Sequence, residues 1–169
     1  MRHRIWQGVR ALFAWIRPLD LAPAEALLSP ALLALFKRLR RSEQLHSLGV
    51  LETLRAEGHD HPDLLVAGLL HDVGKSRAPI GLVGRTLVVL VRAFLPGLYG
   101  RWAGGEANGW RRAFVVAEAH PAWGAEMVGE AGASPRVVAL VRRHQEKVNE
   151  PGTEEERLLL ALQAADAAN

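Results

Sequence analysis

The stretch Leu69-Leu70-His71-Asp72-Val73-Gly74-Lys75 decides how this chain of 169 residues is interpreted. It closes a strongly apolar run with helical spacing, which is expected to form a helix that Asp60 caps, with Pro62 in the first turn and His71 at the end. Packing needs neither His71 nor Asp72 there, and burying an imidazole and a carboxylate is costly unless they are paired or bound to a cation. Gly74 is expected to end the helix and to place Lys75 beside the pair. This helix end is therefore the centre of a candidate site.

Helical spacing of apolar residues continues on both sides of this stretch. Further helices are expected at about 1–17, 24–41 (with Pro30 opening a new helix after Ser29), 42–58 with Ser42 as cap, 80–95, 110–131, 135–147 and 153–167. The glycine-rich segment from Gly97 to Gly109 predicts a loop. No alternating strand pattern of useful length is found. The predicted fold class is all-α, a compact helical bundle, with residues 1–41 as amphipathic, basic helices packed on a domain of residues 42–169.

The composition restricts the chemistry of any site. Hydrophobic residues make up 49% of the chain and charged residues 23%, which is typical of a globular protein and excludes a disordered one. The chain has no cysteine, so disulfides and thiolate metal sites are excluded. Any metal must bind to imidazole and carboxylate groups. The absence of cysteine suits a cytoplasmic protein.

Four further residues qualify as partners of the His71-Asp72 pair. His46 lies among apolar residues of the preceding helix, and His120, His144 and Asp166 each fall in a different predicted helix or at its start. Helical bundles build metal sites in this way, from side chains that project inward from several helices. Each residue also has a structural explanation when taken alone. A single histidine on an apolar face is usually a core residue, His120 before Pro121 suits a helix cap, and Asp166 could face water.

Taken together and in order, these residues resemble the HD-domain superfamily of metal-dependent phosphohydrolases. The order His46, His71-Asp72, Asp166 is similar to the superfamily's defining pattern, and 69–75 looks like its signature helix end. His120-Pro121 with the following Gly124-Ala125-Glu126-Met127 resembles the third-histidine segment of the bimetallic branch, which includes HD-GYP-type phosphodiesterases. Arg143-His144-Gln145-Glu146 resembles the His-His-Glu segment of that branch. The resemblance covers roughly residues 42–167.

The resemblance implies a role for each position. His46, His71, Asp72 and Asp166 would hold one metal, and Asp72 would bridge to a second metal supported by His120 and His144. The cofactor would be one or two divalent transition-metal ions, with iron or manganese favoured. Asp72 and Lys75 would be the catalytic residues, with Lys75 stabilising charge on the phosphate. Alternatively, Lys75 only answers the dipole at the end of a helix.

The implied reaction is hydrolysis of a phosphodiester or phosphomonoester by metal-activated hydroxide. The substrate would be a phosphorylated small molecule, first of all a nucleotide. Lys147-Val148-Asn149-Glu150-Pro151-Gly152 stands where HD-GYP enzymes carry their Gly-Tyr-Pro motif, so hydrolysis of cyclic di-GMP is not implied. Ser42 replaces the glutamate of trimetallic members, and Gln145 removes a further ligand from the second site. The alternative function is a non-catalytic, metal-binding HD module in signalling or as a membrane-surface scaffold.

Other conspicuous residues have structural explanations. His59-Asp60-His61 looks like a metal cluster but lies in the turn before a helix, where Asp60 is expected to cap. Trp102, Trp110 and Trp123 would either stack on a base or fill the core, and core filling is expected for at least two of them. Arg101, Arg111 and Arg112 either bind phosphate or lie in solvent. Residues 80–112 separate two ligand segments and are expected to set substrate specificity.

The distribution of charge raises the question of a membrane surface. Residues 1–41 carry eight basic and two acidic residues, a net charge of +6, whereas the whole chain has only +3. No signal peptide is predicted, and Arg85, Arg92 and Pro96 argue against a membrane span between Ile80 and Tyr99. Residues 1–17 and 80–99 either pack on the domain or contact a membrane peripherally. The expected location is the cytoplasm, with membrane association as the alternative, and the oligomeric state stays open.

Overall fold

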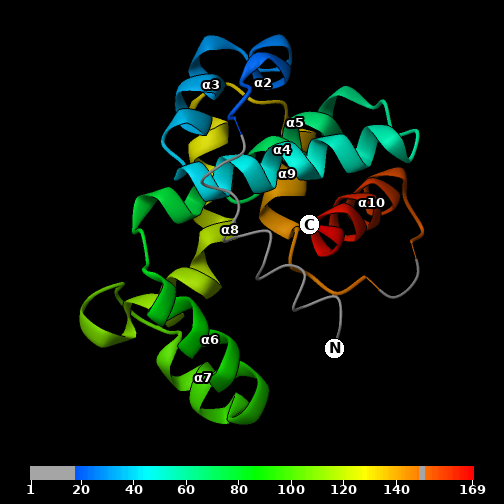
Figure 1. Cartoon of the computed structure of the whole chain (residues 1–169). Coiled ribbons are helices and arrows are strands. Elements are labelled where there is room, and N and C mark those ends of the chain that lie inside the picture. Colours follow the sequence, from blue (N-terminus) through cyan, green and yellow to red (C-terminus); the bar gives the residue numbers. More distant parts are fainter. Residues whose placement is uncertain (1–17, 149–150) are drawn as a thin grey trace.

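The described part of the chain is entirely helical. The computed structural model describes residues 18–148 and 151–169, and the helix expected over residues 1–17 lies outside them. In chain order the α-helices are α2 (Ala22–Leu27), α3 (Pro30–Lys37), α4 (Arg41–Ala56), α5 (Pro62–Leu70), α6 (Leu82–Phe94), α7 (Pro96–Trp102), α8 (Arg112–Glu130), α9 (Pro135–Arg143) and α10 (Glu154–Ala168). Short 3₁₀ helices follow α5 (η1, Val73–Arg77) and precede α8 (η2, Gly109–Arg111). The predicted all-α class is confirmed (Figure 1).

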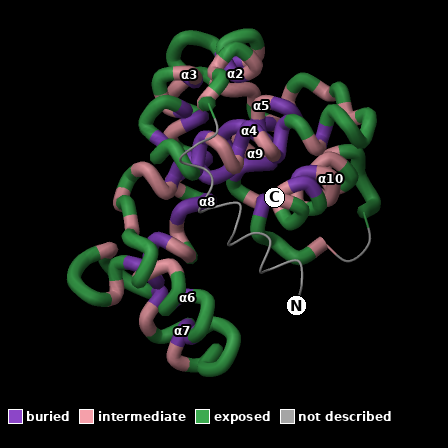
Figure 2. Tube along the Cα trace, viewed as in Figure 1, coloured by how far each residue is buried: buried purple, intermediate pink, exposed green. Residues whose placement is uncertain are grey.

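Helix α5 lies at the centre of the bundle. Figure 2 shows the buried residues gathered where α4, α5, α8 and α9 meet. Six of the nine residues of α5 are buried, which explains why its sequence is apolar on every side. A Cβ on Gly68 would lie 2.9 Å from Leu54 Cδ1, so the missing side chain lets α5 approach α4 closely. The C-terminal end of α5, which His71 follows, is therefore held in place by the surrounding helices.

Helices α2 and α3 share the core of the bundle. Ala24, Leu28, Leu32 and Phe36 belong to the same buried cluster as the leucines of α4, α5 and α10. Phe36 is completely buried. The proposed division of the chain at residue 41 stays a prediction.

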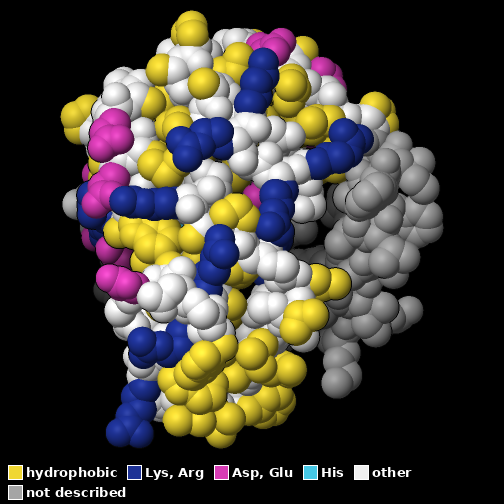
Figure 3. Space-filling view, turned by 90° about the vertical axis from the view of Figure 1, so that its left-hand side faces the viewer, with side chains coloured by type: hydrophobic (Ala, Val, Ile, Leu, Met, Phe, Trp, Pro, Cys, Tyr) yellow, Lys and Arg dark blue, Asp and Glu magenta, His cyan; other side chains and the backbone are white. Residues whose placement is uncertain are grey.

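A second, smaller hydrophobic cluster joins α6, α7 and the first turns of α8. It contains Val88, Val91, Tyr99 and Phe114. Helices α6 and α7 form a hairpin that extends from the main bundle (Figure 1), and its surface is rich in hydrophobic side chains (Figure 3). The Tyr99 hydroxyl donates a hydrogen bond to Glu118 Oε2 at 3.0 Å, and burial together with this carboxylate raises the pKa of Tyr99 to about 12.

The predicted loop between Gly97 and Gly109 is wrong in its first half. Residues 96–102 form α7, which Pro96 opens at its first position. Glycines at 97 and 100 disfavour a helix by about 1 kcal/mol each. The burial of Tyr99 and the packing of Trp102 against Phe114 offset that cost. The loop is confined to the residues between α7 and η2, where Gly105 has a φ of +93°.

Several helix starts agree with the sequence, and two do not. Ser29 caps α3, in agreement with the helix predicted to open at Pro30, and Ser134 and Thr153 cap α9 and α10. Helix α4 begins at Arg41 rather than after Ser42, and Glu43 accepts a hydrogen bond from the Arg40 N–H at 3.0 Å. Helix α5 is capped by His61, whose Nδ1 accepts from the Asp63 N–H at 3.2 Å, so the predicted Asp60 cap is wrong. Helix α9 ends at Arg143, four residues before the predicted end, so that His144 lies at the end of the helix.

Within residues 18–148 and 151–169, no helix is both long and apolar enough to cross a bilayer.

Candidate metal centre

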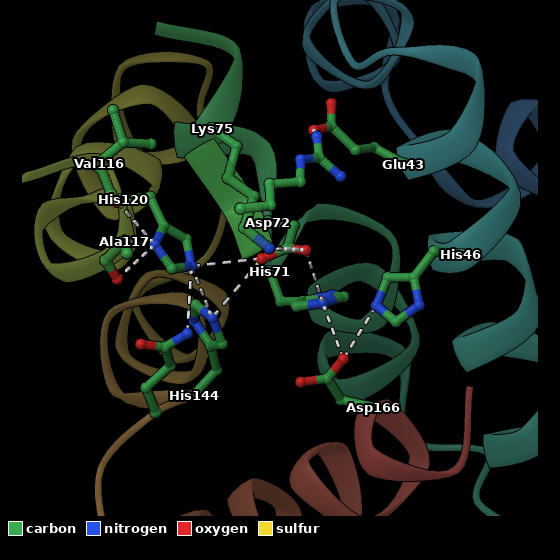
Figure 4. Close-up of polar contacts among 12 residues, drawn as sticks. Glu43, His46, His71, Asp72, Lys75, Val116, Ala117, His120, His144 and Asp166 are labelled. Carbon is green, nitrogen blue, oxygen red and sulfur yellow. Dashed lines mark hydrogen bonds and ion pairs between the residues drawn. The ribbon is translucent and has the colours of Figure 1, made fainter. Parts of the chain in front are cut away.

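The centre forms where α5 ends against four other helices. His71 caps the C-terminus of α5, and Asp72 follows before η1 begins. Both side chains are buried, with 0% and 5% of their surface exposed. Figure 4 shows His46 and Asp166 on one side of this pair and His120 and His144 on the other. All six predicted ligands therefore meet at one place, from α4, the end of α5, α8, the end of α9, and α10.

The first group consists of His46, His71 and Asp166. The distance between His46 Nε2 and Asp166 Oδ1 is 2.9 Å, and His71 Nε2 lies 3.5 Å from the same oxygen. These donor atoms lie close enough together to bind a single ion. His71 Nε2 is buried and has no hydrogen-bond partner in the described part of the chain. A buried imidazole nitrogen left unpaired beside a carboxylate is what a metal site without its ion would contain.

The second group consists of Asp72, His120 and His144, all of them buried. His120 Nε2 lies 3.3 Å from Asp72 Oδ1, and His144 Nε2 lies 3.8 Å from the same atom. The two imidazole Nε2 atoms are 3.3 Å apart. Three donor atoms from three elements thus converge within the reach of one ion.

Asp72 connects the two groups through its two oxygens. Oδ1 faces His120 and His144, whereas Oδ2 lies 3.6 Å from His71 Nε2 and 2.5 Å from Lys75 Nζ. A carboxylate that presents one oxygen to each ligand group has the arrangement of a bridging ligand. Lys75 is half-buried and forms an ion pair with the same Oδ2.

Backbone carbonyls orient three of the four imidazoles. Nδ1 of His71 contacts the Gly68 carbonyl at 2.9 Å, Nδ1 of His120 contacts Val116 at 3.0 Å, and Nδ1 of His144 contacts Val141 at 2.8 Å. A carbonyl only accepts hydrogen bonds, so each Nδ1 carries the proton and donates it. In the neutral rings Nε2 therefore presents its lone pair to the centre, which is the usual preparation of a histidine ligand.

The charges of the centre suit a cation. Burial alone would raise the pKa of Asp72, but Lys75, His71 and His120 outweigh burial and hold this pKa well below its usual range. Burial also opposes ionisation of Asp166, yet its contacts with His46 and His71 lower its pKa strongly. Both carboxylates are thus anionic near neutral pH. Burial lowers the pKa of His144 to about 4, so this imidazole is neutral and available as a ligand.

The two carboxylates favour the protonated form of His71 in the protein alone. Burial would lower its pKa, but the charges of Asp72 and Asp166 outweigh burial and raise it. A divalent ion at this position would take the place of that proton, since it repels the proton from Nε2 and neutralises the carboxylates itself.

A close backbone contact fixes the second group against the first. A Cβ built on Gly74 would lie 2.0 Å from the His120 carbonyl oxygen and 2.7 Å from the Gly124 nitrogen. Only a glycine permits η1 to pack this tightly on α8. The prediction that Gly74 ends a helix is wrong, because α5 ends at Leu70 and Gly74 lies inside η1. Its function is to let the backbone of η1 approach the helix that carries His120.

Several residues near the centre were not predicted from the sequence. Gln163 Nε2 donates to the carbonyl oxygens of His144 at 3.1 Å and Glu146 at 2.7 Å, and so it fixes the end of α9. Buried Glu43 pairs with Arg85 of α6. Gln145 Nε2 lies 3.4 Å from His120 Nε2. Pairs such as Glu43 and Arg85 are 42 positions apart, and neither local sequence carries a signal of the contact.

The histidines and tryptophans for which the sequence offered a structural explanation lie outside the centre. His61 caps α5, and its Nε2 is 2.8 Å from Arg136 Nη1. Trp102 packs against Phe114, the Arg77 guanidinium lies 5.5 Å from the centre of the Trp123 ring, and Trp110 is 64% exposed. Neither His59 nor His61 belongs to a group of potential metal ligands among the described residues.

Comparison with known families adds an independent result. Residues 45–168, which are most of the chain, match the HD domain. The chain belongs to the HD domain family. This family consists mostly of metal-dependent phosphohydrolases, and all six candidate ligands lie inside the matched region of this HD domain. The comparisons with curated proteins and with solved structures gave no match.

Proposed function

We propose that this HD domain is a phosphohydrolase with two metal ions that share Asp72. The observation that carries the proposal is the position of Asp72 between two ligand groups, with one carboxylate oxygen toward each. His46, His71, Asp72 and Asp166 would hold the first ion. Asp72, His120 and His144 would hold the second. The assignment to a bimetallic type of HD domain belongs to this proposal, since the family match does not distinguish between types.

The donor set supports a transition metal. Four imidazoles and two carboxylates are intermediate in softness, which suits iron, manganese or a similar divalent ion better than calcium. When bound, such ions supply Lewis acidity toward phosphoryl oxygens and activate water as the nucleophile. Imidazoles that already donate Nδ1–H to carbonyls need no rearrangement before they bind the ions.

Lys75 is proposed to bind the phosphate of the substrate. Its ammonium group forms an ion pair with Asp72 Oδ2, and its side chain is 30% exposed. Lys75 can therefore contact both the centre and a substrate that binds from solvent. A cation held in this place by a buried carboxylate is already positioned for the negative charge that grows on a phosphoryl group. The ion pair with Asp72 also accounts for Lys75 without a catalytic role. Kinetics can separate the two, because the catalytic role predicts a loss of kcat in Lys75→Met with unchanged metal content.

The proposed substrate is a phosphodiester or phosphomonoester of a nucleotide. A centre with two ions can bind two phosphoryl oxygens, which supports phosphodiesters as the first class to test. The cytoplasm, where nucleotides are abundant, remains the proposed location.

Metal content and hydrolysis of the full chain test this proposal. Protein loaded with manganese or iron under low oxygen should contain about two ions and should hydrolyse nucleotide diesters or monoesters. Asp72→Ala should lose both ions and all activity, because it removes the shared ligand. His120→Ala should retain about one ion, and His61→Ala should retain both.

Two outcomes would contradict the proposal. Full metal content in Asp72→Ala would exclude this residue as the bridge. Two ions bound without hydrolysis of any phosphate ester would instead support the non-catalytic HD module.

A further inference from the structure

The hairpin of α6 and α7 exposes a hydrophobic helix face that has no partner among the described residues. This outer face of α6 consists of Val83, Leu87, Leu90 and Phe94, whose spacing of four, three and four residues aligns them on one side of the helix. The exposed fractions are 83% for Val83, 43% for Leu87, 48% for Leu90 and 77% for Phe94. Leu82, Val89 and Leu95 beside this face are also at least half exposed. Exposed apolar surface of this extent usually marks an interaction site.

The fold of the hairpin does not require the outer face. The opposite side of α6 carries Gly84, Val88 and Val91, and the two valines are buried in the small cluster with α7 and α8. A Cβ on Gly84 would lie 3.1 Å from Ala113 Cβ, so this side approaches α8 closely. Helix α6 is therefore apolar on two sides, and within the described part of the chain only one of them packs against other helices.

The chain around the outer face is strongly basic. Residues 76–112 contain six arginines and a single acidic residue, Glu106, which gives a net charge of +5. Among the described residues, Arg101, Arg111 and Arg112 form no ion pair, and Arg92 lies 5.3 Å from the centre of the Tyr99 ring. Figure 3 shows Lys and Arg side chains bordering the hydrophobic patch at this end of the molecule. The surface thus combines apolar contact area with unneutralised positive charge.

We propose that the outer face of α6 docks on an anionic lipid bilayer. An interfacial helix buries an apolar face at the boundary of the acyl chains, while basic residues beside it contact anionic headgroups. Trp110, which is 64% exposed in η2 and lies against Trp102 of α7, suits the headgroup region. The contact is peripheral, since no helix among the described residues can span a bilayer. This inference does not depend on the proposed phosphohydrolase activity.

Charge argues against two other partners for the outer face of α6, namely a second copy of the chain and residues 1–17. A second copy of the chain would bring the same unpaired arginines, Arg101, Arg111 and Arg112, toward those of the first, and like charges disfavour association. Residues 1–17 carry four arginines and no acidic residue, so they are also positively charged. An anionic bilayer complements both the apolar face and the arginines around it.

Sedimentation of the full-length, metal-loaded protein with lipid vesicles tests the proposal. The probe vesicles contain phosphatidylcholine with about one third phosphatidylglycerol, and pure phosphatidylcholine vesicles serve as the neutral reference. The protein should bind the anionic vesicles at low salt, bind the neutral ones weakly, and dissociate as the salt concentration rises. The variant Val83→Glu with Phe94→Glu should weaken binding at least about tenfold, because it places two negative charges in the apolar face.

The matched control variant carries the same change of charge elsewhere. Ala31→Glu with Ala34→Glu alters two exposed positions of α3 and should retain vesicle binding. Both double variants should keep the helical circular dichroism and the metal content of the parent chain, which excludes misfolding as the cause. Unchanged binding of Val83→Glu with Phe94→Glu would overturn the proposal. So would equal binding to neutral vesicles, or a dimer in sedimentation analysis that the same variant dissociates.

Discussion

At the scale of single residues, the candidate metal centre depends on a backbone contact as much as on its proposed ligands. Gly74 brings η1 against the carbonyl of His120, and the neighbouring Asp72 thereby reaches the imidazoles of α8 and α9. The six ligands are recognisable in the sequence by type and order. The close approach of Gly74 to α8 cannot be recognised in the sequence, because a glycine after a helix is equally typical of a helix terminator.

Replacement of Gly74 by alanine should therefore destabilise the protein and disturb the centre. The new Cβ would collide with backbone atoms of α8, which cannot rotate away as a side chain can. We expect a loss of about 3 kcal/mol or more in the free energy of unfolding, measured by urea denaturation, and a lower metal content. The control is Gly100→Ala, since Gly100 lies in α7 with no atom within 4 Å of an added Cβ. A Gly74→Ala variant as stable as the parent chain would show that the η1–α8 contact is looser than described.

Substitutions of His61 and Asp60 test which of these residues caps α5. His61 Nδ1 accepts the Asp63 N–H and its Nε2 lies beside Arg136, whereas Asp60 makes no cap hydrogen bond. We expect His61→Ala to lower the free energy of unfolding by about 1 kcal/mol, and Asp60→Ala to change it little. Metal content should stay at the parent level in both variants. The reverse order of stabilities in thermal or urea denaturation would restore Asp60 as the cap.

At the scale of helices, local sequence patterns predict the elements of the bundle better than those of the hairpin. The long helices α4, α8 and α10 agree with the expected ranges because apolar spacing and capping residues act together there. Helix α7 was missed because its glycines disfavour a helix locally, and the burial of Tyr99 that offsets them comes from α6 and α8. Tertiary packing of this kind has no signal within the segment itself.

The ion pair between Glu43 and Arg85 should connect the hairpin to the bundle. Glu43 of α4 is 6% exposed, so removal of its partner in Arg85→Met leaves a nearly buried carboxylate without that cation. We expect a loss of about 1–2 kcal/mol in the free energy of unfolding. The matched control is Lys37→Met, which breaks the exposed pair with Glu25 and should cost less than about 0.5 kcal/mol. Equal effects of the two substitutions would mean that the Glu43–Arg85 pair contributes no more than a surface pair.

At the scale of the whole molecule, the centre joins segments from both ends of the described chain. His46 and Asp166 are 120 positions apart, yet their side chains are 2.9 Å from each other. Periodicity predicts that each ligand lies on a helix, but not which ligands form a group. The resemblance to the HD domain supplied that grouping, and the geometry adds the division of Asp72 between the two groups.

Because its ligands come from five helices, the centre should couple metal binding to the stability of the entire bundle. The unfolded chain does not assemble these ligands, so an ion that binds the native state stabilises it by mass action. At a free metal concentration of one hundred times Kd this contributes about 2.7 kcal/mol, which corresponds to a rise of roughly 5–10 °C in Tm for a domain of this size. Differential scanning calorimetry of the full chain with manganese and with a chelator measures this difference. Asp72→Ala should show the same Tm under both conditions, since it lacks the carboxylate that is proposed to bind both ions. If the parent chain also melted at the same temperature with and without metal, the six residues would be a buried polar network rather than a metal centre.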